Sequence, residues 1–451
     1  MTRLFGTNGI RGVVGPDMNA DLALKIGRAV GTAFGGPVAL ARDTRLSGPM
    51  LARAAASGLM SAGCDVIDLG VVPTPCAQYF LAKSGHLKGG VVVTASHNPR
   101  EFNGLKALDA RGMEASHEDE EAIESIFFDG RFRVAAWSEV GSIRSDDTAN
   151  HRYLEAILAK VDVDAIRKSA FTVVVDPGNG AGCVVTPYLL RSLGCRVISL
   201  NGQPDGAFPG RMPEPIPDHI GDLMRVVSEV HADLGIAHDG DADRAIFVDD
   251  KGSFVYGDKS LALLAKAVIQ GAGGTVVTPV STSTLIDDVV RAAGGRVVRT
   301  RVGSPIVART MFETGAAFGG EENGGVIFPD HQFCRDGAMS AAKMLELLAH
   351  EGKRLSSLVA ALPQYQLRKA NVSVPVERRD AVLASLVELT KGRKVDTTDG
   401  VKIVEADGAV LVRPSGTEPI FRVYAEGRTP ERAEALAAEG VDLIKKALSR
   451  R

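Results

Sequence analysis

The chain has 451 residues, more than one hydrophobic core usually organises, which predicts three or four domains. A composition with 45% hydrophobic and 24% charged residues is that of an ordinary soluble globular protein. The net charge of −3 and the aromatic content of 5% argue against nucleic acid or an anionic membrane as a partner, so any bound anion must be held by local groups.

The five cysteines are scattered and lack the paired spacing of a zinc site, which favours reduced thiols over a disulfide framework. The N-terminal residues show no apolar segment of signal-peptide length, and no apolar run approaches about 18 residues, so we expect no membrane-spanning helix. A cytoplasmic location is therefore predicted. The oligomeric state, monomer or homodimer, stays open.

One local pattern occurs three times and predicts the architecture of most of the chain. Each copy consists of an apolar strand, a loop of polar or small residues, a helix, a glycine and a second apolar strand, a βαβ signature that indicates parallel or mixed sheets. The copies occupy residues 37–69, 171–200 and 275–300. We therefore expect three related α/β domains, at residues 1–150, 151–252 and 253–365. The segment 137–149 is the most loop-like join.

The tail, residues 366–451, has a different pattern. A helix is expected at 379–389, and a final helix at 430–448 begins after Thr429, a good N-cap followed by proline. The expected strands lie at residues 371–376, 401–405, 409–412 and 420–426. Two helices beside an antiparallel sheet predict a smaller α+β domain. The predicted fold is thus three α/β domains with mixed sheets plus this α+β domain, around a central cleft.

Ser96 follows directly after a strand that the sequence predicts to be buried. The valines 91–93 form this strand, and Asn98-Pro99 then signals a turn. Ligands of open α/β sheets bind at the carboxyl ends of strands, so the Ser96 hydroxyl is a candidate nucleophile. An ordinary turn serine is the alternative on this stretch alone.

Asp239, Asp241 and Asp243 alternate in one loop between two predicted strands. Three carboxylates so close together repel one another unless a cation lies between them. An EF-hand is disfavoured, because its sixth position would be Arg244 instead of glycine. Hard oxygen ligands with room for a phosphate oxygen predict one Mg²⁺, whereas a solvated acidic turn is the alternative.

Three further loops offer groups for a phosphorylated polyol, although each is ambiguous alone. The loop 319–325 is glycine-rich and carries acids and an amide that can accept hydrogen bonds from hydroxyl groups. The loops 413–419 and 5–12 each place an arginine among small residues, as a phosphate site would. With one chemical group per predicted domain, the sequence favours a cleft that binds a sugar phosphate, with phosphate also carried on Ser96.

Four stretches resemble, in the same order, the four active-site loops of the α-D-phosphohexomutases. They are Thr94–Pro99, Asp239–Arg244, Gly320–Gly324 and Arg413–Thr417. The resemblance extends over essentially the whole chain, and the fold of that family, three related α/β domains and a smaller fourth, agrees with the repeat described above.

The resemblance implies a role for each loop. Ser96 would be a phosphoserine that gives its phosphate to a sugar phosphate, forming a bound sugar 1,6-bisphosphate. Mg²⁺ would be held by the Ser96 phosphate together with the three aspartates, and Lys106 would take part in proton transfer if its neighbours lowered its pKa. The implied catalytic residues are Ser96, Lys106, Arg11, His97 and Arg244, with His97 more suited to shaping its loop. The implied substrate-binding residues are Glu321, Asn323, Arg413, Ser415, Gly416 and Thr417.

The opening, residues 5–12, resembles the phosphoglucosamine mutases, so interconversion of glucosamine 6-phosphate and glucosamine 1-phosphate is the leading prediction. The sugar loop Glu321–Gly325 has a form associated with archaeal members, in which Gly325 replaces an imidazole that some members use near the sugar. His331 is a conceivable substitute. The alternatives are a phosphomannomutase/phosphoglucomutase, a metal-dependent sugar-phosphate phosphatase, and a non-catalytic sugar-phosphate binder.

Overall fold

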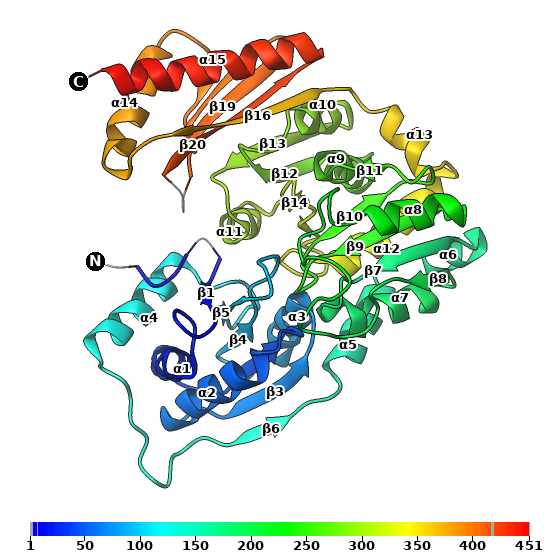
Figure 1. The fold of residues 1–451 in the computed structure, drawn as a ribbon. Helices are drawn as coiled ribbons and strands as arrows, with labels where there is room; N and C mark the ends of the chain where they lie inside the picture. The colour runs from blue at the N-terminus through cyan, green and yellow to red at the C-terminus, as the bar shows by residue number, and fades with distance from the viewer. Residues whose placement is uncertain (1–2, 7, 416–418, 451) are drawn as a thin grey trace. The chain divides into compact units, whose positions relative to one another are not determined.

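The computed structural model describes residues 3–6, 8–415 and 419–450, and it divides into two compact units (Figure 1). The first unit comprises Met1–Ser260 and Asn323–Val359, and the second comprises Leu261–Glu322 and Ala360–Arg451. The long helix α9 (Gly257–Ile269) carries the chain from the first unit into the second.

The first sheet of unit 1 contains six strands in the order β1-β5-β4-β2-β3-β6. These strands are β1 (Ile10–Val13), β2 (Val38–Arg42), β3 (Val66–Val71), β4 (Gly89–Val93), β5 (Phe102–Asp109) and β6 (Ile143–Ser145). β2 runs parallel to β3 and β4, whereas β5 is antiparallel to both β4 and β1, so the sheet is mixed. Its helices are α1 (Ala20–Phe34), α2 (Gly48–Ser61), α3 (Thr74–Ser84) and α4 (His117–Asp129). Every residue of the central strand β4 is buried, as its run of valines predicts.

The second sheet of unit 1 contains five strands in the order β11-β10-β9-β7-β8. They are β7 (Thr172–Asp176), β8 (Arg196–Ser199), β9 (Leu234–His238), β10 (Ala245–Val248) and β11 (Phe254–Val255). β7 is parallel to its neighbours β8 and β9, while β9 and β10 form an antiparallel hairpin. The remaining helices of this unit are α5 (Ala149–Leu158), α6 (Val163–Ser169), α7 (Thr186–Ser192), α8 (Gly221–Glu229) and α12 (Gly337–Glu351); α13 (Leu355–Ala360) ends one residue beyond it.

Unit 2 combines the third α/β element with the tail. Parallel strands β12 (Gly274–Pro279), β13 (Gly295–Thr300) and β14 (Phe318–Gly320) occur with helices α10 (Leu285–Ala292) and α11 (Ser304–Thr314). The tail sheet is antiparallel throughout, in the order β16-β20-β19-β18-β17. Its elements are β16 (Gln366–Ser373), α14 (Arg379–Leu389), β17 (Val395–Asp396), β18 (Val401–Glu405), β19 (Gly408–Pro414), β20 (Ile420–Gly427) and α15 (Pro430–Ser449). Mixed and parallel α/β sheets followed by an α+β tail confirm the predicted fold class.

Some elements differ from the sequence prediction. The strand expected at 371–376 is β16, which spans Gln366–Ser373, and a short 3-10 turn follows Pro375, which has no N–H to offer a sheet ladder. The segment expected to be a loop at 137–149 contains β6, which pairs parallel to β3. β6 and β17 are short strands with little buried surface, so neither has a hydrophobic alternation that a sequence could reveal.

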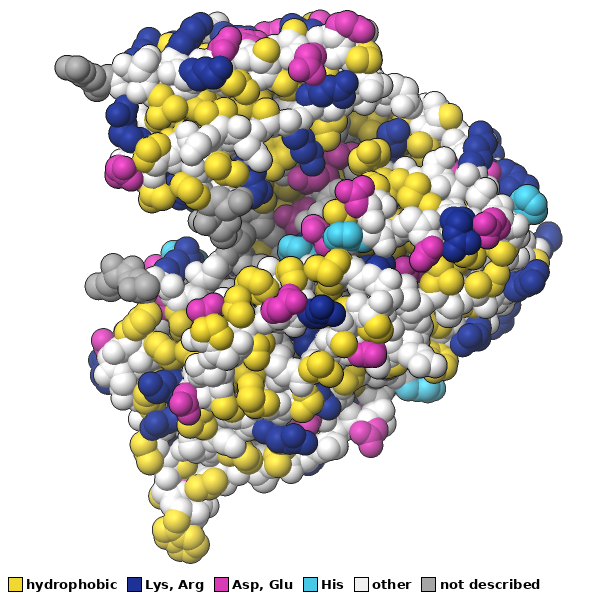
Figure 2. Space-filling view, viewed as in Figure 1, with side chains coloured by type: hydrophobic (Ala, Val, Ile, Leu, Met, Phe, Trp, Pro, Cys, Tyr) yellow, Lys and Arg dark blue, Asp and Glu magenta, His cyan; other side chains and the backbone are white. Residues whose placement is uncertain are grey.

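Among the described residues, no helix is both long and apolar enough to cross a membrane. All five cysteines are buried free thiols, as expected from their spacing. Figure 2 shows Lys and Arg side chains interspersed with Asp and Glu over the visible face.

Candidate active site

Ser96 lies three residues beyond β4 in a strained and buried loop. Its φ of 51° falls in the left-handed region that non-glycine residues rarely adopt, and its side chain is fully buried. The Ser96 N–H donates to Thr94 Oγ1 at 2.9 Å, and its hydroxyl donates to Asp239 Oδ2 at 2.7 Å. A strained serine bonded to a carboxylate far along the chain fits a functional site better than an ordinary turn.

Arg45 fixes the shape of the serine loop, and the sequence analysis did not single it out. Its buried guanidinium donates to the carbonyl oxygens of Ser96 at 2.8 Å and of Asn98 at 2.7 Å, and further to those of Pro99 and Phe102. The Asp43 carboxylate pairs with this guanidinium at 3.1 Å. The polar loop after β2 was the one sequence feature that could have pointed to Arg45. β2 pairs in parallel with β4, so the loops that follow the two strands lie at the same edge of the sheet.

The three aspartates lie on the tight loop that joins β9 to β10. One carboxylate oxygen from each of Asp239, Asp241 and Asp243 lies within 4.8 Å of the others, and all three side chains are buried. Within the part of the chain that the structure describes, Asp241 Oδ1 and Asp243 Oδ1 have no hydrogen-bond partner. Buried carboxylate oxygens without donors are costly unless a cation takes them as ligands, so this donor set fits a hard divalent metal ion.

Gly240 allows the aspartate loop to approach the serine loop. A Cβ at this position would lie 2.5 Å from the Ser96 carbonyl oxygen, well inside van der Waals contact. Only a glycine therefore permits the hydrogen bond between Ser96 and Asp239 in this arrangement.

Burial and mutual repulsion set the protonation of the aspartates. Burial, with help from the neighbouring carboxylates, raises the pKa of Asp239 above its usual range. Burial acts in the same direction on Asp241, but the Lys106 ammonium and the Thr74 hydroxyl donate to it and bring the pKa of Asp241 well below its usual value. An added cation would favour the ionised form of all three carboxylates.

Lys106 lies on β5 and is buried, not on a surface loop. Its Nζ is 2.9 Å from Asp241 Oδ2, 3.5 Å from Asp243 Oδ2 and 3.8 Å from Glu114 Oε1. Burial alone would lower the pKa of Lys106, but these carboxylates outweigh it and raise that pKa above its usual value. In this arrangement Lys106 is a protonated counter-ion, the opposite of the lowered pKa that a general base requires.

The predicted arginines and His97 lie around the same serine. Arg11 Nη1 donates to Asn98 Oδ1 at 2.7 Å, and Arg244 Nη2 lies 3.0 Å from His97 Nδ1. Burial and these two guanidinium groups lower the pKa of His97 to about 2, so its imidazole is neutral. Arg11 Nε and Arg244 Nε are buried and make no hydrogen bond among the described residues, although Arg244 Nε lies 3.7 Å from Asp239 Oδ2. Both N–H groups can therefore donate to an anion.

The remaining predicted residues divide between the two units. Asn323 is in unit 1, where its Oδ1 accepts from the Gly325 N–H at 3.0 Å. In unit 2, Glu321 is buried at the end of β14, and Arg413 pairs with Asp399 at 3.1 Å. Ser415 is buried, with its N–H bonded to the Ile420 carbonyl oxygen. The predictions for Gly416 and Thr417 fall outside the described residues.

His331 belongs to a buried cluster in unit 1. Its ring stacks on Tyr79 with the ring centroids 5.0 Å apart, and its Nε2 lies 3.5 Å from Asp336 Oδ2. Tyr153 donates to the other oxygen of Asp336 at 2.5 Å. This packing indicates a structural role for His331. The neighbouring Arg335, which bonds to Asp243, was missed by the sequence analysis because nothing in its local sequence marks it.

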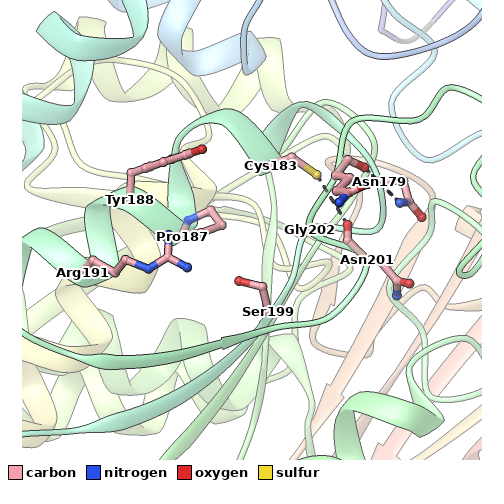
Figure 3. Close-up of a pocket in the computed structure, with 9 residues that line it drawn as sticks. Asn179, Cys183, Pro187, Tyr188, Arg191, Ser199, Asn201 and Gly202 are labelled. Atoms are coloured by element: carbon pink, nitrogen blue, oxygen red, sulfur yellow. Dashed lines mark hydrogen bonds between the residues drawn. The ribbon is translucent and has the colours of Figure 1, made fainter.

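A cavity of about 480 Å³ lies beside α7 and β8 and contains none of the predicted site residues (Figure 3). Its polar groups partly satisfy one another: Asn179 Nδ2 donates to the Gln203 carbonyl oxygen, and Cys183 Sγ to that of Asn201. The predicted site residues of unit 1 therefore gather around the serine and aspartate loops and not around this cavity.

The chain matches all four domain models of the phosphoglucomutase/phosphomannomutase family. Alpha/beta/alpha domain I matches residues 2–134, domain II residues 151–252, domain III residues 256–365, and the C-terminal domain residues 371–443.

Similar proteins are aligned over nearly their whole length. A phosphoglucomutase/phosphomannomutase of Thermococcus kodakarensis is 48% identical, covering 99% of this chain and 100% of the relative. A phosphoglucosamine/phosphogalactosamine mutase of Sulfurisphaera tokodaii is 41% identical, covering 97% and 98%. The crystal structure of a phosphoglucomutase/phosphomannomutase family protein of Burkholderia thailandensis superimposes with a TM-score of 0.90 at 31% identity, covering 99% and 98%. The chain, an isomerase of the intramolecular phosphotransferase type, belongs to the α-D-phosphohexomutase family.

Proposed function

We propose that this protein is a Mg²⁺-dependent phosphoglucosamine mutase that works through a phosphoserine at Ser96. The observation that carries the proposal is the 2.7 Å hydrogen bond from Ser96 Oγ to Asp239, beside two buried carboxylate oxygens that have no donor in the described part of the chain. The relative from Sulfurisphaera tokodaii, named for glucosamine and galactosamine phosphates, supports an amino-sugar substrate.

Asp239, Asp241 and Asp243 would hold the metal ion together with the phosphate on Ser96. When bound, the ion neutralises charge on the transferring phosphoryl group. The Nε–H groups of Arg11 and Arg244, which make no hydrogen bond within the described part of the chain, would donate to the same phosphate. Lys106 keeps Asp241 ionised and adds a fixed positive charge.

The reaction would consist of two opposite phosphoryl transfers. In the first, the bond between phosphorus and Ser96 Oγ breaks and a bond to the free sugar hydroxyl forms, giving the sugar 1,6-bisphosphate. After the bisphosphate turns over, its other phosphate returns to Ser96. The proton lost by the first sugar hydroxyl is balanced by the proton gained by the oxygen released in the second transfer, so no net proton change accompanies the isomerisation.

The predicted substrate loops would bind the sugar and its second phosphate. Glu321 and Asn323 would accept hydrogen bonds from its hydroxyl or amino groups, and the loop of Arg413, Ser415, Gly416 and Thr417 would hold the phosphate that is not transferred. We retain the division into four domains at residues 1–150, 151–252, 253–365 and 366–451, and a cytoplasmic location, as parts of this proposal.

The test combines the intact mass of the purified protein with its rate of turnover of sugar phosphates. Freshly purified protein should contain a population one phosphate heavier, with the phosphate on Ser96, and Ser96→Ala should lose turnover while keeping its circular dichroism spectrum. The value of kcat/KM should be highest for glucosamine 1-phosphate among the glucosamine, glucose and mannose 1-phosphates.

Each other result has a definite meaning. A higher value for glucose or mannose would make the protein a phosphoglucomutase or phosphomannomutase, a function that the name of the Thermococcus relative favours. Release of inorganic phosphate in place of isomerisation would indicate a phosphatase, and phosphate on a residue other than Ser96 would refute the mechanism.

A further inference from the structure

Gly325 follows the sugar loop's Asn323 and Gly324, and its backbone does not require glycine. Unlike Gly320 and Gly324, it lacks a positive φ. A Cβ built at Gly325 would nevertheless lie 2.2 Å from Cδ and 3.0 Å from Cγ of Arg335. The Arg335 side chain thus fills the space that a side chain at position 325 would need.

The guanidinium of Arg335 donates to Asp243, the third aspartate of the loop 239–244, which is called the metal loop below. Its Nη2 lies 2.5 Å from Asp243 Oδ2, and the Arg335 residue is only 4% exposed. Lys106 is the second cation at the same oxygen, at the longer distance of 3.5 Å. With Oδ2 occupied in this way, Asp243 Oδ1 is the buried oxygen that remains without a hydrogen-bond donor among the described residues.

Backbone hydrogen bonds join the segment around Arg335 to β15 (Val326–Ile327) and to the metal loop, which fixes the point from which the Arg335 side chain extends. Arg335 forms an antiparallel bridge with Ile327, and the next N–H, that of Asp336, donates to the Val326 carbonyl oxygen at 2.9 Å. The Gly337 N–H then donates to the Ala242 carbonyl oxygen, inside the metal loop, at 3.3 Å.

The side chain of Asp336, the residue after Arg335, also holds this segment in place through hydrogen bonds. It caps α12 by accepting from the Met339 N–H at 2.9 Å, and it accepts from Tyr153 and from Gln332 Nε2. Three buried hydrogen bonds therefore hold the residue next to Arg335, which is the support a positioning group requires.

We propose that Arg335 is a positioning residue that fills the space beside Gly325 and holds Asp243 for the metal ion. The inference rests on the proposed function, because it takes the aspartate triplet to be a divalent-cation site. It goes further in naming a pair, Gly325 and Arg335, in which the first residue must lack a side chain for the second to reach the metal loop.

The first experiment measures Mn²⁺ binding by titration calorimetry on the purified full chain. Arg335→Ala should weaken Mn²⁺ binding by about 10-fold or more, the usual effect of removing a partner of a metal ligand, and should lower kcat with little change in KM for the sugar phosphate. Arg335→Lys, which keeps the charge, should recover part of the loss. Arg225→Ala, on the exposed face of α8, is the matched control and should bind Mn²⁺ like the wild type.

The second experiment tests the pair. Gly325→Ala alone should weaken Mn²⁺ binding about as much as Arg335→Ala, because the new Cβ displaces the arginine. In the Arg335→Ala background, Gly325→Ala should cost nothing more, since the group it would displace is already gone.

The outcomes separate the two proposals. Absence of Mn²⁺ binding by the wild type would overturn the proposed function. If the wild type binds but Arg335→Ala binds equally or more tightly, or if the effects of the two substitutions simply add, the metal site stands and the role of Arg335 is refuted. Circular dichroism of each variant excludes unfolding as the cause, and Arg335→Lys carries the test if the alanine variant does not fold.

Discussion

Burial and the neighbouring charges determine the protonation state of a charged residue in this protein, as Lys106 shows. The family resemblance predicts a role in proton transfer for Lys106, but the structure surrounds its ammonium with three carboxylates. The same residue type on an exposed loop would be an ordinary solvated lysine. Its chemistry here follows from residues more than a hundred positions away, Asp241 and Asp243, together with Glu114.

Glu120, in the first turn of α4, gives a prediction at the residue scale. Burial raises its pKa from 4.5 to about 7, despite an ion pair with Arg3 at 3.1 Å. The folded state therefore binds a proton that the unfolded state has already lost between pH 4.5 and about 7, so this group makes the protein less stable as the pH rises through that interval.

Glu120→Gln should remove this dependence. We expect the variant to match the wild type at the acidic end of the interval and to be the more stable protein above it, in urea denaturation at a series of pH values. A stability difference that stays constant over the whole interval would contradict the raised pKa.

At the scale of elements, the site is built where strands end. The exit of β4 carries Ser96, the exit of β2 carries Arg45, and the β9–β10 turn carries the aspartates. The two loops approach closely enough to bond because Gly240 has no side chain. The predicted consequence is a sharp dependence of activity on this one glycine.

Gly240→Ala should place a Cβ against the Ser96 carbonyl oxygen and break the hydrogen bond from Ser96 to Asp239. We expect turnover to fall by about 100-fold, as a misplacement near 1 Å can cause. Gly221→Ala is the matched control, because a Cβ at Gly221 meets no atom of the described residues within 4 Å, and it should leave the rate unchanged. Equal rates for the two variants would show that the close approach is not needed.

At the scale of the molecule, all residues of the predicted metal site belong to unit 1. Residues as distant in sequence as Arg11, Lys106, Asp243 and Arg335 meet within it. A ligand that binds only the folded state stabilises that state in proportion to the logarithm of its concentration, so metal ion should stabilise this unit.

Mg²⁺ at about 100 times its dissociation constant should raise the free energy of unfolding by about 2.7 kcal/mol, and EDTA should remove the gain. Chemical denaturation of the full chain with and without Mg²⁺ measures the effect. Asp239→Asn should abolish it, whereas Asp164→Asn, on the exposed side of α6, should not. An equal Mg²⁺ effect in both variants would refute the assigned site.

The sequence by itself determined the repeated strand–helix–strand pattern, the different tail and the residues proposed for the site. The buried valines of β4, the glycines after the repeated helices and the Thr429 cap are local signals, and each was confirmed because short-range hydrophobic pattern and turn chemistry specify such features. The same locality explains the errors: β6 and β17 have little buried surface, so no pattern marked them.

Only the tertiary structure decided how the residues act on one another. Arg45 and Arg335 look like any other arginines in the sequence, and they became part of the site because strand pairing and the docking of α12 bring them to Ser96 and Asp243. The sequence gives no reason for a glycine at 325, whereas the structure places the Arg335 side chain in the space that a Cβ there would need. Protonation and positioning depend on contacts between distant segments, and those contacts exist only once the chain has folded.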